Sequence, residues 1–193
     1  MNRHVKKQIF KWLIKPVLML IASVFYDRRY LTGRHFEKEF GGWVWVFKGI
    51  FHQKLFGFNA SVPWPMHPFV RISNPANITF HVDDLHVFQT YGTYFQNFSG
   101  HIYLGRGVYI APNVGLITAN HDLYDLDEHL PGKDVRIGDH CWLGMAAIIM
   151  PGVELGERTV VAAGAIVTKS FPAGWCVIGG NPARVIKQLE KPA

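Results

Sequence analysis

The sequence predicts a mainly β protein, a coil of short parallel strands with three flat sides, preceded by an α-helical N-terminal segment. Two observations predict it. From Ile102 onward an aliphatic residue returns every six positions, whereas residues 1–62 are rich in aromatic and aliphatic residues without that period. The 193 residues, 49% of them hydrophobic, suffice for one principal core and not for two large domains.

Residues 1–62 are predicted to be helical and to flank the rest of the chain. An apolar run at 16–26 follows five cations, namely Arg3, Lys6, Lys7, Lys11 and Lys15. No small-residue cleavage site follows the run, and a spanning helix needs about 20 apolar residues, which Lys11 and Lys15 interrupt. The segment therefore either lies on a membrane surface through residues 1–30 or packs against its own domain or a neighbouring subunit.

A second apolar segment, at about 43–56, is predicted to be buried. Pro63, Pro65 and Pro68 then end any helix, because proline lacks the amide proton and restricts the residue before it. We place the domain boundary there, so that the repeat domain covers 63–187 and residues 188–193 form a C-terminal tail.

The chain has a formal charge of +6, which suits a nucleic acid, an anionic membrane surface or a phosphorylated ligand. No nucleic-acid-binding motif accompanies the charge, so no nucleic acid partner is predicted. Cys141 and Cys176 form no close pair and predict neither a disulfide nor a metal site. These features favour a cytoplasmic location, which for a surface-bound protein is the inner face of the cell membrane.

Eight six-residue units carry the repeat, and in each the first residue is Leu, Ile or Val. These first positions are Leu104, Ile110, Ile137, Leu143, Ile149, Leu155, Val161 and Val167. The fifth position is small or β-branched until Phe171 breaks the rule; its members are Val108, Val114, Cys141, Ala147, Val153, Thr159 and Ala165. Ile72 and Ile78 begin an earlier, looser instance.

A period of six fits neither the helical period of 3.6 nor the strand period of 2. A coil of three short strands fits it, with the first residue of each unit pointing at the axis and successive coils joined by parallel ladders. Glycines at the second position and Gly or Asn at the fourth are expected to supply positive φ angles at the corners. These are Gly105, Gly138, Gly144 and Gly156, then Gly107, Asn113, Gly152 and Gly164.

The repeat is interrupted between Leu116 and Ile137. These positions are 21 residues apart, three more than a full coil of 18, so a small insertion is expected, with a protruding loop at 117–136. A long polar excursion from a tight repeat is usually functional. His121 lies on its rising stem, between Asn120 and Asp122.

From about Ile102 to Lys187 the sequence resembles the hexapeptide-repeat acyltransferases, in particular the maltose, galactoside and capsular-polysaccharide O-acetyltransferases. The similar motifs are Ile-Ala-Pro-Asn-Val at 110–114, Asn-His-Asp at 120–122, Ile-Gly-Asp-His-Cys-Trp-Leu-Gly at 137–144, Pro-Gly-Val at 151–153, Ala-Gly-Ala-Ile-Val-Thr-Lys at 163–169 and Gly-Asn-Pro-Ala-Arg-Val-Ile at 180–186. The resemblance implies a left-handed β-helix, an exception to the right-handed crossover rule. It also implies a homotrimer with active sites between subunits, and acetyl-CoA as acyl donor with no metal.

The resemblance further implies the site residues. His121 matches the catalytic histidine, which would take the proton of a sugar hydroxyl as that oxygen attacks the thioester. We expect the Gly144 N–H to stabilise the oxyanion and Glu128 to orient the imidazole. The positions that match cofactor contacts are Met145, Ala163, Thr168, Lys169, Arg184 and Lys187. Cys141 is interpreted as packing and not as a nucleophile.

The acceptor is least well predicted. The family's sugar-contacting asparagine precedes the histidine by one coil, where Asn97 is the nearest candidate, and Asp122 and Trp142 are further candidates. The N-terminal half is longer, more aromatic and more basic than in the small maltose-type enzymes. This difference favours a lipid-linked or cell-surface glycan over a free disaccharide.

Three other functions use related features. A γ-class carbonic anhydrase would bind zinc through histidines, for which His81, His86, His101 and His121 are available, but their spacing does not reproduce that family's pair. A noncatalytic β-helix scaffold would have lost the histidine or the terminal cations, and both are present. Serine acetylation is disfavoured because the long helical N-terminal domain of those enzymes is absent from this sequence.

Overall fold

A computed structural model of the protein describes residue 8 and residues 10–191. The chain divides into two compact units, residues 1–66 and 67–193, and each is described separately below. This division falls four residues after the boundary predicted from the prolines. The cations at positions 3, 6 and 7 lie outside the described residues.

The N-terminal unit is helical, as predicted. Its elements are η1 (Phe10–Ile14), α2 (Lys15–Phe25), η2 (Arg28–Tyr30), α3 (Arg34–Glu37), α4 (Gly41–Gly49) and η3 (Ile50–Leu55). Trp43 and Phe36 meet edge to face at a centroid distance of 5.2 Å and form part of its core. Gln53 is also buried, and its Oε1 accepts hydrogen bonds from the Tyr26 hydroxyl and the Met66 N–H.

The predicted burial of the 43–56 segment is correct only in part. Trp43 and Val46 are buried, whereas five other large apolar residues of this segment are exposed, namely Val44, Phe47, Phe51, Leu55 and Phe56. The nine-residue helix α4, continued by η3, has more apolar positions here than one core-facing side can hold. None of the described helices is long and apolar enough to cross a membrane.

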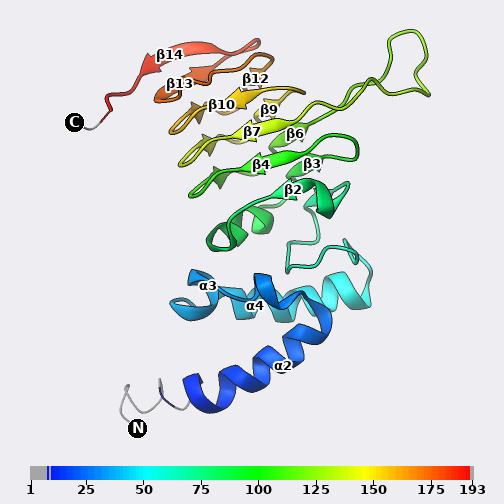
Figure 1. Ribbon diagram of the computed structural model, residues 1–193, viewed down its shortest axis with the longest axis vertical. Helices are drawn as coiled ribbons and strands as arrows, with labels where there is room; N and C mark the ends of the chain where they lie inside the picture. Colours follow the sequence, from blue (N-terminus) through cyan, green and yellow to red (C-terminus); the bar gives the residue numbers. More distant parts are fainter. Residues whose placement is uncertain (1–7, 9, 192–193) are drawn as a thin grey trace. The chain divides into compact units, whose positions relative to one another are not determined.

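The second unit contains three sheets, and the chain contributes short strands to one sheet after another (Figure 1). The first sheet comprises β1 (Arg71–Ile72), β3 (Tyr94–Gln96), β6 (Gly115–Ile117), β9 (Ile148–Ile149) and β12 (Ile166–Val167). The second comprises β2 (Ile78–Thr79), β4 (Ile102–Leu104), β7 (Val135–Ile137) and β10 (Glu154–Leu155). The third comprises β5 (Tyr109–Ile110), β8 (Trp142–Leu143), β11 (Val160–Val161), β13 (Cys176–Gly179) and β14 (Arg184–Gln188). Two short 3-10 segments, η4 (Pro75–Asn77) and η5 (Val82–Gln89), lie among the early strands.

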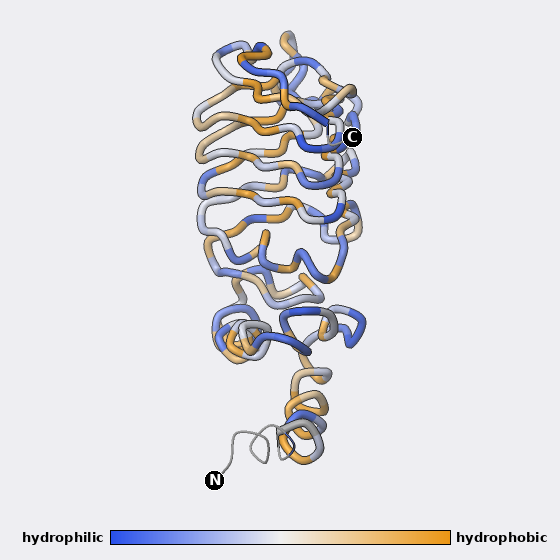
Figure 2. The backbone as a smooth tube through the Cα atoms, turned by 90° about the vertical axis from the view of Figure 1, so that its left-hand side faces the viewer, coloured by the Kyte–Doolittle hydropathy of each residue, from blue (hydrophilic) through white to orange (hydrophobic). Residues whose placement is uncertain are grey.

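The strand pairing confirms a mainly β fold with parallel ladders. Every strand pair is parallel except β13 with β14, which is antiparallel. From β4 to β12, successive strands of the chain belong to the second, third and first sheets in rotation, so each coil in this stretch contributes one strand to each side. Figure 2 shows these coils stacked on one another, with apolar residues returning at similar places.

The repeat positions form the core as predicted. All eight first-position residues are at most 6% exposed, and the seven small or β-branched fifth positions are at most 1% exposed. Phe171, which breaks the rule, is half-buried and forms a single bridge with Leu155. Large aliphatic and small residues therefore alternate around one interior, which is how a narrow coil fills its centre.

The corners of the coil lie at the fourth position of the first seven units. From Gly107 to Gly164 all seven fourth positions have φ between 53° and 81°, although His140, Ala146 and Arg158 are not glycines. The second-position glycines have no positive φ, so their predicted role at the corners is wrong. They allow close approach of the coils instead, since a Cβ on Gly138 would lie 2.7 Å from the Glu157 nitrogen.

The insertion is larger than predicted. Leu104 pairs with Ile137 and Leu116 with Ile149, each 33 residues apart, whereas Leu143 pairs with Val161 at the regular 18. One coil therefore contains 15 extra residues. Leu116 and Ile137 lie on adjacent sides, and the prediction erred by counting them as one full coil apart.

Candidate active site

The extra residues form an arm, which we define as residues 118–134 between β6 and β7. Figure 1 shows it extending away from the stack of coils. Its two branches pair in antiparallel fashion: the Leu130 N–H donates to Asn120 O at 2.9 Å, and His121 is bridged to His129. The paired stem gives His121 a defined backbone position although the side chain is exposed.

A glutamine that the sequence analysis missed fixes the base of the arm. Gln96 on β3 accepts hydrogen bonds at Oε1 from the Thr118 and Ala119 N–H groups, at 2.9 and 3.1 Å. Its Nε2 donates to Ala119 O at 2.9 Å. The side chain thus satisfies three backbone groups where the chain leaves the coil, which a buried backbone requires. A polar residue at the end of a short strand, one coil before the arm, was the available signal.

The imidazole of His121 is oriented by a backbone carbonyl. Its Nδ1 lies 2.7 Å from Leu126 O. Because a carbonyl oxygen can only accept, Nδ1 must carry the proton, and in the neutral ring Nε2 keeps its lone pair. The expectation that Glu128 orients this ring is wrong, since the Leu126 carbonyl already occupies Nδ1. Glu128 contributes its own backbone carbonyl, which accepts from the Asp122 N–H at 3.0 Å.

His129 is a second residue that the sequence analysis missed. Its ring lies against that of His121 at a centroid distance of 4.1 Å and an interplanar angle of 37°. Phe98 also meets the His129 ring, edge to face, at a centroid distance of 4.9 Å. Phe98, His129 and His121 therefore form a row of rings that restricts the tilt of His121. Positions eight apart in a loop give no signal in sequence.

Gly144 cannot serve as the predicted oxyanion donor. Its N–H donates to Val161 O of the next coil at 2.8 Å, so it has no free amide proton. A Cβ at this position would lie 2.7 Å from both Val161 O and Ala163 N. Gly144 is therefore needed for close packing between coils.

The predicted cofactor residues lie in two groups. Met145 and Ala163 lie at the same corner of neighbouring coils, where Met145 O accepts from the Gly164 N–H at 2.8 Å. The others, on or near β12 and β14, are exposed, namely Thr168, Lys169, Arg184 and Lys187. The β14 segment is tied to β12 because the Ala183 N–H donates to Ile166 O at 2.8 Å.

A pocket of about 260 Å³ lies at the base of the arm. It is lined by Ala119, Asn120, Leu130, Pro131, Lys133, Met150, Pro151 and Thr168. Asn120 precedes His121 directly, and Thr168 is one of the predicted cofactor residues. The pocket therefore connects the histidine's neighbourhood with one part of the predicted cofactor site, and it adds Lys133 as a cation that the sequence analysis did not select.

The acceptor candidates have different positions. Asn97 is fully buried, and its amide bonds the Asn74 N–H and the Asn74 and Asn77 carbonyls, so its predicted acceptor role is replaced by a structural one. Asp122 Oδ1 accepts from the Tyr124 and Asp125 N–H groups and closes the turn of the arm. Trp142 is exposed on β8 beside Tyr109, and no hydrogen bond or ring contact within the described residues joins it to the arm.

Cys141 has the environment of a packing residue. Burial raises the pKa of its thiol to about 11, and the S–H donates to Gly156 O at 3.2 Å. A thiol with this pKa is protonated near neutral pH and is a poor nucleophile. Within the ranges that the structure describes, no three His, Cys, Asp or Glu side chains are grouped to hold a metal ion.

The second unit is thus a coil of six-residue repeats that presents a histidine on an inserted arm. The family described as "Bacterial transferase hexapeptide (six repeats)" matches residues 134–169. A Dictyostelium discoideum protein with a provisional acetyltransferase name is 37% identical over 140 residues, which are 71% of this chain and 70% of that protein.

Two solved structures are similar to the chain. A galactoside acetyltransferase in complex with coenzyme A is 30% identical with a TM-score of 0.57, over 66% of this chain and 62% of that chain. A maltose O-acetyltransferase from Clostridium difficile 630 is 33% identical with a TM-score of 0.53, over 63% and 64%. The chain belongs to the hexapeptide-repeat transferase family, which confirms the predicted family. It spans about half the length of other curated relatives that it matches.

Proposed function

We propose that the chain is an O-acetyltransferase that moves an acetyl group from acetyl-CoA to a sugar hydroxyl, with His121 as general base. The observation that carries this proposal is the 2.7 Å contact between His121 Nδ1 and Leu126 O. It leaves Nε2 as the proton acceptor on an exposed ring. The acetyltransferase names of the relatives and the coenzyme A in one similar structure support the choice of donor.

The proposed reaction needs no covalent enzyme intermediate. His121 Nε2 takes the hydroxyl proton while the sugar oxygen attacks the thioester carbonyl carbon. As the carbon–sulfur bond breaks, the imidazolium returns that proton to the departing thiolate. The products are an acetyl ester and the coenzyme A thiol, and His121 is neutral again. Met145, Ala163, Thr168, Lys169, Arg184 and Lys187 are proposed to hold the donor, with the cations at its phosphates.

The proposal includes a left-handed coil and a homotrimer, as in the resemblance described above. The tip of the arm supports a covering subunit, because Leu123, Tyr124 and Leu126 are 86%, 100% and 70% exposed. Large apolar side chains gathered on a protruding loop favour burial against a partner. Trp142 and Asp122 are proposed to contact the acceptor, Trp142 from a neighbouring subunit.

The acceptor is proposed to be a lipid-linked or cell-surface glycan, modified in the cytoplasm at the inner face of the membrane. Residues 1–30 are proposed to associate with that membrane surface. The exposed apolar side chains of the N-terminal unit support this part of the proposal.

The test measures acetyl transfer by the full chain from acetyl-CoA to a panel of mono- and oligosaccharides. The rate is monitored through the coenzyme A thiol that the reaction releases. Replacement His121→Ala should lower the rate roughly 10²- to 10⁴-fold, the usual contribution of a general base, with an unchanged circular dichroism spectrum. His140→Asn is the matched control, because His140 is exposed and asparagine tolerates its φ of 56°. Full activity of the His121→Ala variant would disprove the mechanism.

A further inference from the structure

The N-terminal unit carries all of the chain's excess positive charge. Residues 1–66 contain eleven Lys and Arg against three Asp and Glu, a formal charge of +8. Residues 67–193 contain nine against eleven, a formal charge of −2. No acidic residue precedes Asp27. An anionic partner is therefore expected for the N-terminal unit itself, separately from the donor phosphates at the coil.

Helix α2 exposes an apolar stripe in this cationic unit. Val17, Leu20, Ile21 and Val24 recur at the i, i+3, i+4 and i+7 spacing that places side chains on one face of a helix. All four are exposed, Leu20 by 72% and Val24 by 75%, and Ala22 is the one buried residue of α2. Eleven residues span roughly 16 Å, about half of a bilayer core, so the stripe suits a helix lying in the interface.

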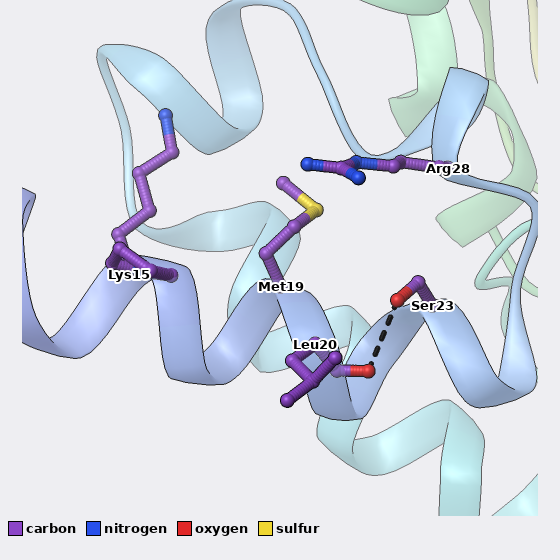
Figure 3. Close-up of a pocket in the computed structure, with 6 residues that line it drawn as sticks. Lys15, Met19, Leu20, Ser23 and Arg28 are labelled. Atoms are coloured by element: carbon purple, nitrogen blue, oxygen red, sulfur yellow. Dashed lines mark hydrogen bonds between the residues drawn. The ribbon is translucent and has the colours of Figure 1, made fainter.

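A pocket of about 340 Å³ places two cations beside this helix. It is lined by Lys15, Pro16, Met19, Leu20, Ser23 and Arg28. Figure 3 shows Lys15 and Met19 projecting from the same side of α2, and the Arg28 side chain extending across toward Met19 from η2, the segment after the helix. Neither the Lys15 ammonium nor the Arg28 guanidinium forms an ion pair or hydrogen bond with a described residue. The pocket thus has two cations free to bind an anion above an apolar base.

We propose that the N-terminal unit binds the surface of a bilayer rich in anionic phospholipid. Helix α2 lies in the interface with Leu20 and Val24 among the acyl chains, and Lys15 and Arg28 hold the phosphate of one lipid. This proposal deepens the membrane-surface association in the proposed function and rests on it, by naming the lipid charge, the inserted residues and the phosphate site. The charge of +8 favours a bilayer over a second copy of the chain, because two such units would repel each other.

The test is flotation of the full chain with vesicles of phosphatidylglycerol and phosphatidylcholine, compared with vesicles of phosphatidylcholine alone. Binding to the mixed vesicles is expected, with a marked decrease at high salt because screening weakens the attraction of charges to the surface. Replacing Lys15 and Arg28 together by alanine should weaken binding roughly 30-fold, since each cation near an anionic surface contributes about a fivefold increase in affinity. Replacing Arg71 and Lys191 removes the same charge from the second unit and should change binding little.

The apolar stripe is tested by Leu20→Glu with Val24→Glu, which should weaken vesicle binding roughly 100-fold or more. Phe69→Glu, at an exposed apolar position of the second unit, is the matched control. Circular dichroism verifies folding, which should persist because both replaced side chains are exposed. The proposal is overturned if the stripe variant binds the mixed vesicles as tightly as the parent chain does. It is also overturned if the parent chain does not bind the vesicles and the stripe substitutions instead change the oligomeric state.

The proposed vesicle binding and the proposed acetyl transfer can be disproved separately, because different variants affect them. The His121→Ala variant should bind mixed vesicles as tightly as the parent, since His121 lies in the second unit. The Leu20→Glu, Val24→Glu variant should still transfer acetyl groups to a water-soluble acceptor. Loss of vesicle binding in His121→Ala would contradict the assignment of binding to the N-terminal unit.

Discussion

At the residue scale, two kinds of contact hold His121 in a state that suits the proposed base chemistry. The Leu126 carbonyl fixes the tautomer, and the His129 ring fixes the tilt. A backbone acceptor stays uncharged at every pH, so its orienting effect does not titrate. His129 can be replaced without removing that carbonyl, which separates the two contacts experimentally.

We expect His129→Ala to lower kcat of the proposed transfer about 3- to 10-fold, the value of one ring contact, with little change in KM. His129→Phe should restore most of the rate, because an aromatic ring without titrating groups can still stack on His121. Steady-state kinetics of both variants measure this. Equal loss in the two variants would show that stacking is not the role of His129.

Cys141 makes stability depend on pH in the alkaline range. Burial raises the pKa of its thiol from 9.0 to about 11, so the folded state holds this proton more tightly than the unfolded state. The resulting stability is fully present below pH 9 and is lost as pH rises to about 11, amounting to roughly 2 to 3 kcal/mol. Urea titrations across this range should show the decrease, and a Cys141→Ala variant should show a flatter profile from a lower starting value.

At the element scale, the coil has corners at which some residues are strained, and positions at which neighbouring coils come so close that only glycine fits. In seven of the eight units the fourth-position residue adopts the left-handed region, whether or not it is a glycine. For a non-glycine residue this backbone conformation costs about 1 to 2 kcal/mol of conformational free energy. The ladder and the buried first and fifth positions hold the corner in place.

Ala146→Gly should therefore stabilise the fold by about 0.5 to 1 kcal/mol, after the entropy of a more flexible unfolded chain is subtracted. Gly138→Ala should destabilise it by several times as much, because the added Cβ would lie 2.7 Å from backbone atoms of the next coil. Chemical denaturation of both variants gives the comparison. The essential result is that the two substitutions change the free energy of unfolding in opposite directions. Stabilisation by Gly138→Ala would contradict the close-approach explanation.

Sequence periodicity predicted the coil well because a buried axis imposes one residue type at a fixed interval. It assigned the corners correctly to the fourth positions but wrongly to the second-position glycines as well, since a glycine is used both for positive φ and for close approach, and composition does not distinguish the two. The family resemblance suggested Asn97 as an acceptor contact, but an asparagine is equally suited to bonding backbone groups, as Asn97 does with Asn74 and Asn77. The Leu126 carbonyl could not be predicted, because a backbone acceptor has no side-chain signature.

At the scale of the whole molecule, the exposed tip of the arm predicts assembly. Replacing Leu123 and Tyr124 by serine should leave the melting temperature of an isolated chain almost unchanged, since both side chains are exposed. It should weaken the proposed trimer and lower transfer activity in parallel. Light scattering across protein concentrations measures the weakening of the trimer, with Phe69→Ser as the control at another exposed apolar position. An intact, fully active trimer would show that the tip has another partner.

The arm adds 15 residues to one coil and enters and leaves the stack without disturbing its register. Leu104 with Ile137, Ile110 with Leu143 and Leu116 with Ile149 all keep the same offset, so the coils above and below it align as if the arm were absent. Insertions of other lengths and compositions at this point would leave the same ladder intact. His121, the proposed base, is thus carried on a segment that can be exchanged separately from the coil, so its surroundings can change by evolution or design while the strand pairing of the coil stays the same.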